Sequence, residues 1–566
     1  MALDAAALNP GPDVVRLGAA TYSTPGGYAY NAAADNPVEI DGMSTSATKL
    51  QVAANTDTAL TVTGGASATV KRMTIDAPFT APGSHPTGLR LSGSADVVDG
   101  VVITGAQGMR GIVEGDTGGL TVTNSKIMLD IGTSDLAVTF LNGTGRIADS
   151  DLSAHLGVDV TGSNVTVERI SLFSSVRGIR VNPSGINGST LHLSSSILLP
   201  LGGSPALRVE GTFGSQPVSA DVHHVTIAGG GSDTGASVAS TVSDASLTLD
   251  SSIIRLGVPI ARDQQGSTAD NVSADYSDIS TGSTNSGSGS ITMGAHNVDV
   301  DPQFVSATDY QLKPTSPVID IGNPAIDPME SPTDFAFFPR LVAGHGGCTP
   351  VSDMGASEFQ HHEPTAAATV TPTTATAGTA VTFDASGSCD STPGAPLSYS
   401  WTFDDGGTGT GVTVAHTFAS AGPHTGTVTV SDTGATTSKA TATVQVNAPV
   451  TNPPPPDTPD FLGATLKGSR TLKVDKKGRF SWRFACPTGS PATCHEVVRL
   501  TADKRTVASA RFNVLAGKTK TVHSKLSKRA RKTLRRKKKL TARATITSTG
   551  DPGDVKVGQA TVKLKL

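Results

Sequence analysis

The stretch VTVERISLFSSVRGIRVNPSG, residues 165–185, decides the fold, because it holds three short strand patterns separated by turn residues. Related units lie at residues 97–115, 120–143, 146–162, 190–211 and 246–263. Their spacing of about 19 to 28 residues suits one coil of a parallel β-helix with loops of variable length. A single coil cannot bury its inner face, so the coils are expected to stack.

The third strand pattern of each unit places apolar residues at equivalent inward positions, at Val138, Val158, Ile179 and Leu207. A β-sandwich of hairpins is the alternative, but Asn-Gly hairpin signals between alternating strands are scarce. The repeats, with the opening NPGPDVVRLGAATYS (residues 9–23), resemble right-handed parallel β-helix proteins of the pectate-lyase-like superfamily.

A different pattern closes the repeats, at DVDPQF (residues 299–304) and DYQLKPTSPVIDIGNP (residues 309–324). With Arg340 and the run Asp353-x-Gly-Ala-x-Glu, it resembles the closing segment of choice-of-anchor Q type β-helix surface proteins. The resemblance implies a cap over the exposed last turn of the β-helix. Asp320 and Asp353 are then expected to accept backbone N–H groups or to pair with Arg340. The loop AIDPMESPTDFAFF (residues 325–338) departs from that pattern.

Beyond the repeats, LSYSWTFDDGGTG (residues 397–409) and VAHTFASAGPHTGTVTVSD (residues 414–432) resemble a PKD domain, an Ig-like module. Trp401 lies within the strand alternation, so we interpret it as a core residue rather than a platform for sugars. A proline-rich linker follows, and the last segment resembles small β-sandwiches appended to secreted actinobacterial proteins. Leu526, Ala530 and Leu534 have helical spacing and predict one short helix there.

The predicted fold is therefore all-β, with five consecutive parts. They are a right-handed parallel β-helix at 1–300, its cap segment at 301–362, an Ig-like PKD β-sandwich at 364–448, a proline-rich linker at 449–459, and a basic C-terminal β-sandwich with one short helix at 460–566.

The small net charge of −4 conceals a division between an acidic body and a basic tail. Residues up to Pro459 carry 17 basic and 42 acidic side chains, whereas the rest carries 27 basic and 6 acidic ones. A basic patch attracts polyanions, so an anionic wall polymer or acidic glycan is the expected partner of the tail. Nucleic acid ranks below these, because the tail lacks interleaved aromatic residues for base stacking.

The four cysteines are expected to pair. Cys486 and Cys494 flank a short polar loop that a disulfide can close. Zinc is the alternative, but no second Cys pair or His pair lies nearby. Cys348 and Cys389 form a second candidate pair, on weaker grounds. Disulfides imply an oxidising compartment.

One constellation could bind a ligand on the repeats. If the third strands stack in register, Asp159, Arg180 and Arg208 occupy the same outward position on consecutive coils, about 4.8 Å apart. A solvated ion-pair ladder is one interpretation, and a site for a uronic acid carboxylate is the other. His192, His223 and His224 show no partner at an interpretable spacing and are interpreted as surface or ladder positions, so no metal ligand is assigned.

The sequence therefore predicts an extracellular or cell-surface protein that binds polysaccharide, cell-wall polymer or another surface ligand. A polysaccharide lyase or glycoside hydrolase acting on acidic polysaccharide is the alternative, which the resemblance to β-helix enzymes keeps open. No cofactor is indicated by the sequence, and Ca²⁺ is left open as a possible ligand. The chain has no apolar run of about 20 residues, and its start lacks a recognisable secretory signal, which we treat as weak evidence.

Overall fold

The computed structural model describes residues 12–31, 37–53, 57–63, 67–77, 86–105, 108–115, 118–130, 135–212, 214–230, 233–264, 270–287, 289–344, 348–360, 363–390, 395–449, 463–488, 493–549 and 555–566. It confirms an all-β fold with a parallel β-solenoid, an Ig-like sandwich and one short helix. The chain divides into two compact units, Met1–Pro449 and Val450–Leu566. Apart from Pro449, the predicted linker lies outside the described residues.

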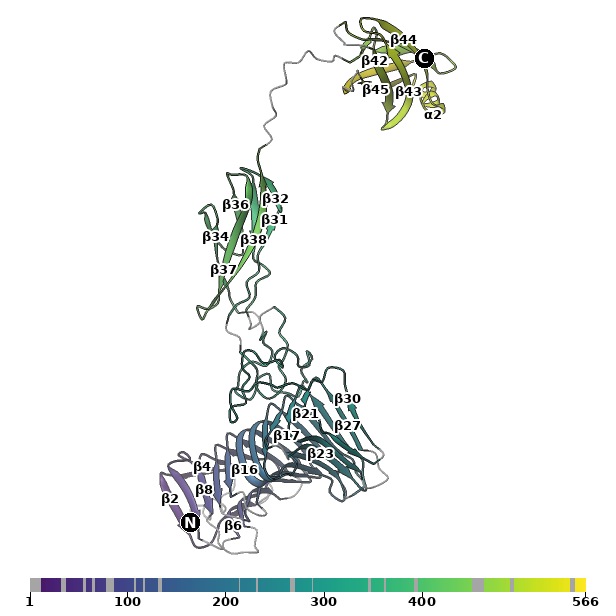
Figure 1. The fold of residues 1–566 in the computed structure, drawn as a ribbon. Coiled ribbons are helices and arrows are strands. Elements are labelled where there is room, and N and C mark those ends of the chain that lie inside the picture. Colours follow the sequence, from purple (N-terminus) through teal and green to yellow (C-terminus); the bar gives the residue numbers. More distant parts are fainter. Residues whose placement is uncertain are drawn as a thin grey trace. The chain divides into compact units, whose positions relative to one another are not determined.

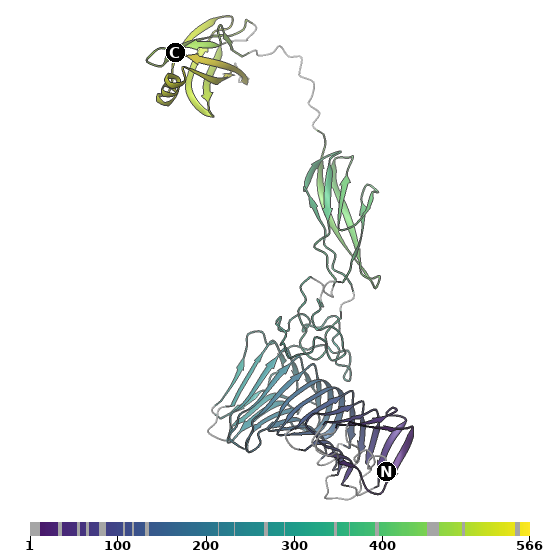
Figure 2. The ribbon, with the colours of Figure 1, turned by 180° about the vertical axis from the view of Figure 1, so that it is seen from behind.

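The solenoid consists of three series of parallel strands, in which each strand pairs with its equivalent one turn later (Figures 1 and 2). The first series is β1 (Asp13–Leu17), β4 (Val38–Gly42), β7 (Ala68–Lys71), β10 (Asp96–Asp99), β13 (Gly119–Thr123), β18 (Ser189–Ser194), β21 (Val218–His223), β24 (Ala245–Asp250), β27 (Asp270–Asp275) and β30 (Ser290–Met293). The second is β2 (Ala20–Thr24), β5 (Thr48–Val52), β8 (Thr74–Ala77), β11 (Val102–Gly105), β14 (Lys126–Leu129), β19 (Ile197–Pro200), β22 (Thr226–Ala228), β25 (Ile253–Arg255) and β28 (Asp278–Ile279). The third is β3 (Tyr28–Asn31), β6 (Thr58–Thr63), β9 (Thr87–Ser92), β12 (Arg110–Glu114), β15 (Leu136–Leu141), β20 (Leu207–Gly211), β23 (Thr234–Ser240), β26 (Val258–Gln264) and β29 (Thr284–Ser286). Two long strands, β16 (Thr144–Thr161) and β17 (Asn164–Asn182), pass through all three series.

The inward residues of the third series form a continuous apolar column. Val138 pairs with Val158, Val158 with Ile179, and Ile179 with Leu207. All four side chains are fully buried. Burying such a side chain stabilises the fold by about 1.5–3 kcal/mol, so the column supplies much of the attraction between turns. The predicted alignment is confirmed.

A single residue in the left-handed conformation turns the chain between the first and second series on successive turns. The members of this row of corners have φ between 48° and 56°, and include Arg72, Asn124, Asp149, Arg169, Ser195, His224, Ser251 and Tyr276. One left-handed residue is enough to redirect the chain sharply, at a cost of about 1–2 kcal/mol for a residue other than glycine. Such corners expose backbone carbonyls to the flank of the solenoid.

The closing segment, residues 296–360, packs along that row of corners. The Gly355 amide donates to the Ser251 carbonyl at 2.7 Å, and the Asn323 amide donates to the Ser251 hydroxyl at 2.8 Å. Met354 packs against Ile253, an apolar residue of β25. Strands β29 and β30 of the last turn stay largely exposed. The segment begins on the last turn, where Val298 pairs with Asp278 of β28, and continues over the flank, which offers the acceptors and the apolar surface that it needs. Its role as a cap over the last turn stays a prediction.

The Ig-like sandwich consists of two sheets. One contains β31 (Thr369–Thr371), β33 (Ala380–Asp384) and β36 (Thr413–Thr417); the other contains β32 (Thr374–Thr376), β38 (Thr437–Asn447), β37 (Gly422–Ser431), β34 (Ser398–Phe403) and β35 (Thr408–Thr410). Trp401 is fully buried between them, and its indole N–H donates to the Gly411 carbonyl at 3.1 Å. It is a core residue.

The C-terminal unit is a second sandwich with a helix beside it (Figure 1). One sheet contains β39 (Thr465–Lys467), β41 (Arg479–Ala485) and β44 (Thr519–Lys525); the other contains β40 (Thr471–Lys473), β46 (Val555–Lys565), β45 (Lys539–Thr549), β42 (Cys494–Ala502) and β43 (Arg505–Val514). The helix α2 (Lys528–Lys537) begins after Ser527, whose hydroxyl accepts from the Ala530 amide. Ala530 and Leu534 bury its apolar face, which confirms the predicted helix. Among the described residues, no helix has the length and apolar character needed to cross a membrane.

Candidate functional site

The predicted ladder residues lie in register on three successive turns of the solenoid. Asp159 pairs with Arg180 along the strands, and Arg180 pairs with Arg208. The Arg180 guanidinium binds Asp159 through two hydrogen bonds, from Nε to Oδ1 at 3.1 Å and from Nη2 to Oδ2 at 2.6 Å. Arg208 donates instead to Glu210, two residues later on β20. Ligand binding by the ladder stays a prediction.

With its neighbours included, the ladder has three arginines against two carboxylates. Arg177 lies 3.6 Å from Glu210, measured from Nη1 to Oε1, and shares that carboxylate with Arg208. Burial is the main reason that the pKa of the Arg177 guanidinium is lowered. The side chains of the three arginines are between 28% and 34% exposed. A carboxylate from solvent can therefore reach the Arg177 guanidinium, which shares its nearest carboxylate, Glu210, with Arg208.

The three histidines that were expected at surface or ladder positions are buried and lie close together. His192, His223 and His224 are 5%, 7% and 2% exposed. His192 of β18 pairs with Asp221 of β21, and His223 follows two residues later on the same face of β21. One ligand atom each from His192, Asp221 and His223 lie within 4.8 Å of one another. The surface alternative is wrong, whereas His192 and His223 do lie in a ladder, because stacking joins residues that are 29 positions apart in the chain.

Several carboxylates surround His223. Its Nε2 atom lies 3.3 Å from Asp221 Oδ1 and 3.8 Å from Asp327 Oδ2, while its Nδ1 atom lies 3.3 Å from Glu330 Oε1. Asp250 Oδ2 is 3.7 Å from the same Nδ1 atom. Burial disfavours the charged ring, but these acidic neighbours outweigh it and raise the pKa of His223 to about 10.

The other two histidines of the group stay neutral more readily. Burial, followed by the nearby positive His223, lowers the pKa of His192. Burial, followed by the positive Arg340, lowers the pKa of His224. Nδ1 of His224 lies 2.9 Å from Glu330 Oε2, so this glutamate bridges His223 and His224.

The signal that could have revealed the group was present in the repeats. Aligning TLHLS with SADVH as equivalent strands places His192 beside Asp221. The contribution of Asp327 and Glu330 could not be found this way, because they come from the closing segment, which has no repeat.

The three cap residues named from the sequence form the interior of the closing segment. Asp353 accepts the amides of Asp320 at 2.8 Å and Phe359 at 2.6 Å, and Asp320 accepts the Gly344 amide at 2.7 Å. Arg340 is 1% exposed and donates to the carbonyls of Gly355 and Ala356, each at 3.0 Å. These contacts have a structural role.

Both predicted disulfides are present. Cys348 is bonded to Cys389, which ties the closing segment to the Ig-like domain. Cys486 is bonded to Cys494 across the short polar loop. The described residues contain no free cysteine.

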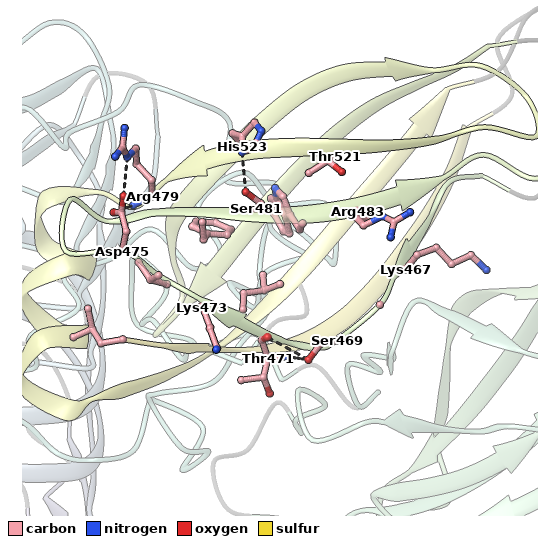
Figure 3. Close-up of a pocket in the computed structure, with 16 residues that line it drawn as sticks. Lys467, Ser469, Thr471, Lys473, Asp475, Arg479, Ser481, Arg483, Thr521 and His523 are labelled. Carbon is pink, nitrogen blue, oxygen red and sulfur yellow. Dashed lines mark hydrogen bonds and ion pairs between the residues drawn. The ribbon is translucent and has the colours of Figure 1, made fainter.

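A pocket of about 930 Å³ opens on the C-terminal sandwich between β39, β40, β41 and β44 (Figure 3). Its charged and polar lining includes Lys467, Ser469, Thr471, Lys473, Asp475, Arg479, Ser481, Arg483, Thr521 and His523. Lys467 and Arg483 lie side by side at one end, and Arg479 pairs with Asp475 at the other, from Nε to Oδ2 at 2.8 Å. Cations thus outnumber carboxylates in this pocket, which we call the cationic groove.

Strand pairing brings like charges into direct opposition around the cationic groove. Lys467 faces Arg483 across β39 and β41. Lys565 faces Lys473 of β40 on one side and Lys539 of β45 on the other. All five side chains are exposed. Like charges directly opposite each other in a sheet are destabilising, so the unit gains nothing in stability from these pairs.

Comparison with known proteins identifies one part of the chain. The PKD domain family model matches residues 361–446. Those residues form a PKD domain. No curated protein matches the chain.

Among solved structures, a carbohydrate-binding module of the β-sandwich superfamily is 17% identical, with a TM-score of 0.16; the match covers 36% of this chain and 96% of the module. Fibronectin(III)-like modules of Clostridium thermocellum CbhA are 13% identical, with a TM-score of 0.16, over 35% of this chain and 94% of that one. A Ca²⁺-stabilized ice-binding adhesin of an Antarctic bacterium is 16% identical, with a TM-score of 0.15, over 34% of this chain and 47% of the adhesin. TM-scores this low do not indicate a function.

Proposed function

We propose that this protein is an extracellular binding protein that adheres to an acidic polysaccharide or to another polyanionic polymer of a surface. The observation that supports this most directly is the set of like-charged pairs across strands around the cationic groove. Two disulfides and a PKD domain support an oxidising, extracellular location. The resemblances to choice-of-anchor β-helix proteins and to secreted actinobacterial sandwiches belong to the same proposal.

The energetics of the like-charged pairs favour an anionic ligand. Each pair costs up to about 1 kcal/mol in the free protein, by the scale of cross-strand interactions. A polymer with regularly spaced negative groups removes that repulsion and gains attraction to every cation it meets. Phe480 and Trp482 line the groove but are buried, so they offer no stacking surface to nucleic acid bases. Acidic glycan is therefore the preferred polyanion.

Removing two cations from the groove is expected to weaken binding without weakening the fold. The double variant Lys467→Ala/Arg483→Ala should bind polygalacturonate about tenfold more weakly at physiological salt. A cation beside an anionic surface contributes about 1 kcal/mol, and salt screens part of that attraction. Calorimetric titration measures the affinity, and thermal unfolding of the C-terminal unit measures stability, which should stay equal or rise.

The variant Arg505→Ala/Arg511→Ala is the matched control, because it removes the same charge from exposed positions of β43. It should keep most of the affinity. Equal losses in both variants would mean that only net charge matters, and would refute a specific role for the groove.

The ladder on the solenoid is a second proposed contact with the same polymer. Arg180→Ala removes a guanidinium from the ladder. The variant is expected to elute from an acidic glycan column at a measurably lower salt concentration than the wild type. Arg146→Ala is the control, since Arg146 is similarly exposed and paired with Glu168. Unchanged retention of Arg180→Ala would remove the ladder from consideration.

Unsaturated products or new reducing ends in the eluate would support the enzymatic alternative, a lyase or hydrolase.

A further inference from the structure

We propose that His192, Asp221 and His223 on the flank of the solenoid, together with Asp327 of the closing segment, bind one zinc ion. The site is independent of the polymer-binding surfaces proposed above. It joins two strands of successive turns to a loop that is distant in sequence. Its bound ion would hold the loop 325–330 against the solenoid.

Two imidazole nitrogens in the group have no hydrogen-bond partner among the residues that the structure describes. They are Nε2 of His192 and Nε2 of His223, on side chains that are at least nine-tenths buried. Nε2 of His223 has an ion-pair contact with Asp221 at 3.3 Å, so Nε2 of His192 is the one without a charged or hydrogen-bonding partner in the described part of the chain. An unpaired polar atom in this position costs about 1–3 kcal/mol. A metal ion that accepts the lone pair of His192 Nε2 and replaces the proton on His223 Nε2 removes that cost.

The arrangement of the ligand atoms is close to that of a zinc site. Zinc binds nitrogen and oxygen at about 2.0–2.2 Å, so two of its ligand atoms stand up to about 4 Å apart. The three atoms from His192, Asp221 and His223 lie within 4.8 Å of one another. Asp221 Oδ1 already lies 3.3 Å from Nε2 of His223, and the Asp221 side chain is 49% exposed.

Asp327 is aimed at the same place by a local turn. Its Oδ1 atom accepts the Met329 amide at 2.7 Å, which leaves Oδ2 to face His223 Nε2 at 3.8 Å. The set of donors is then two nitrogens and two oxygens. Imidazole ligands favour zinc and its neighbours in the transition series over calcium or magnesium.

The groups behind His223 complete the site. Glu330 Oε1 lies 3.3 Å from Nδ1 of His223, on the side of the ring opposite Nε2. A carboxylate in that position holds the proton on Nδ1 and keeps Nε2 available to a metal, as in carboxylate–histidine–zinc arrangements. With Asp250 included, four carboxylates lie within ion-pair distance of His223, an excess of negative charge that a divalent cation balances.

Zinc titration of the full-length protein after chelator treatment tests the site, with a chromogenic chelator as competitor. We expect one tightly bound zinc per chain. His192→Ala and Asp327→Asn should each weaken binding at least tenfold. His296→Ala is the matched control, because His296 forms an exposed pair with Asp275 elsewhere on the solenoid, and it should bind like the wild type.

Hydrogen exchange of residues 326–331 gives a second measurement. Zinc should slow that exchange in the wild type and not in Asp327→Asn, which changes only a loop side chain. Zinc affinity that is equal in the wild type and in His192→Ala would overturn the proposal. Equal displacement of zinc by calcium would also overturn it, because it would show a site made of oxygens alone.

Discussion

Arg340→Ala is expected to release the closing segment from the flank of the solenoid. The guanidinium donates to the carbonyls of Gly355 and Ala356 and, at 2.9 Å, to the hydroxyl of the corner residue Ser195. Alanine removes these three hydrogen bonds, of which two lie within the closing segment and one joins the segment to the corner residue Ser195. It also leaves a space where a large, fully buried side chain stood.

The larger effect of Arg340→Ala is electrostatic. Glu358 is fully buried and lies 3.9 Å from Arg340, measured from Oε2 to Nη1. Burial, and then its neighbour Asp353, already raise the pKa of Glu358, and Arg340 opposes that rise. Without the cation, two buried carboxyl groups face each other. Breaking a buried ion pair from one side costs about 3–5 kcal/mol when the remaining group stays charged, and Glu358 offsets part of that cost by taking up a proton.

Hydrogen exchange measures the expected release. The Gly355 amide, which donates to Ser251 across the junction, should exchange at least about 100-fold faster in Arg340→Ala. Strands β18 and β21 should keep their protection. In Arg340→Lys the exchange rate of the Gly355 amide should lie between those of the wild type and the alanine variant, since lysine keeps the charge but lacks the planar guanidinium. An exchange rate at Gly355 that is the same in the alanine variant as in the wild type would show that Arg340 does not hold the segment.

The solenoid could be predicted because its signal is local and repeated. Val158 and Ile179 lie at the same place in successive units, and period-two alternation assigns them to the inner face without knowledge of the rest. The PKD strands and the helix α2 are likewise encoded in short windows. Each of these elements satisfies its own backbone and buries its own apolar face.

The candidate sites could be predicted only in part, because they depend on which residues become neighbours. Lys467 and Arg483 look like ordinary surface cations until β39 and β41 pair. His192 and Asp221 need the register of one turn on the next. Asp327 needs the path of a segment that was expected at the end of the solenoid and lies on its flank. In all three cases long-range packing decides which residues become neighbours, and no local sequence pattern encodes that packing.

Glu114→Gln is expected to remove a large pH-dependent loss of stability from one turn of the solenoid. Glu114 ends β12 and is fully buried, and neither carboxyl oxygen has a hydrogen-bond partner among the described residues. Burial, and then the nearby Asp96, raise the pKa of Glu114 to about 8 from an ordinary value of 4.5. The folded protein therefore holds a neutral acid there, and the unfolded chain holds an anion above pH 4.5.

The sign of the effect follows from that difference. A carboxyl group whose pKa is raised by folding stabilises the folded state below its unfolded pKa, and this stabilisation is lost as the pH rises to the folded pKa. For Glu114 the loss falls between pH 4.5 and about 8. It amounts to about 4 kcal/mol between pH 5 and pH 9, at 1.36 kcal/mol per pH unit. The wild-type turn should thus be weakest in alkaline solution.

Glutamine keeps the shape of the protonated acid and does not titrate. Its buried amide has a cost of about 1–3 kcal/mol, which is the same at every pH. Relative to the wild type, the variant should therefore gain about 4 kcal/mol from pH 5 to pH 9, or about a thousandfold in exchange protection. The amides of Gly119 and Thr144, which bond to Ser94 and Gly118 beside the carboxyl, report this opening.

The comparison between variant and wild type isolates Glu114 from other titrating groups. Burial also raises the pKa of Asp96. Asp96 is present in both proteins, so only the part of its titration that is coupled to Glu114 remains in the difference. Glu39→Gln is the control, at a partly exposed glutamate that is paired with Lys71, and no gain of this size is expected there. A difference that stays constant from pH 5 to pH 9 would mean that Glu114 is ionised in the folded protein. Some unrecognised cation or donor would then have to stabilise it.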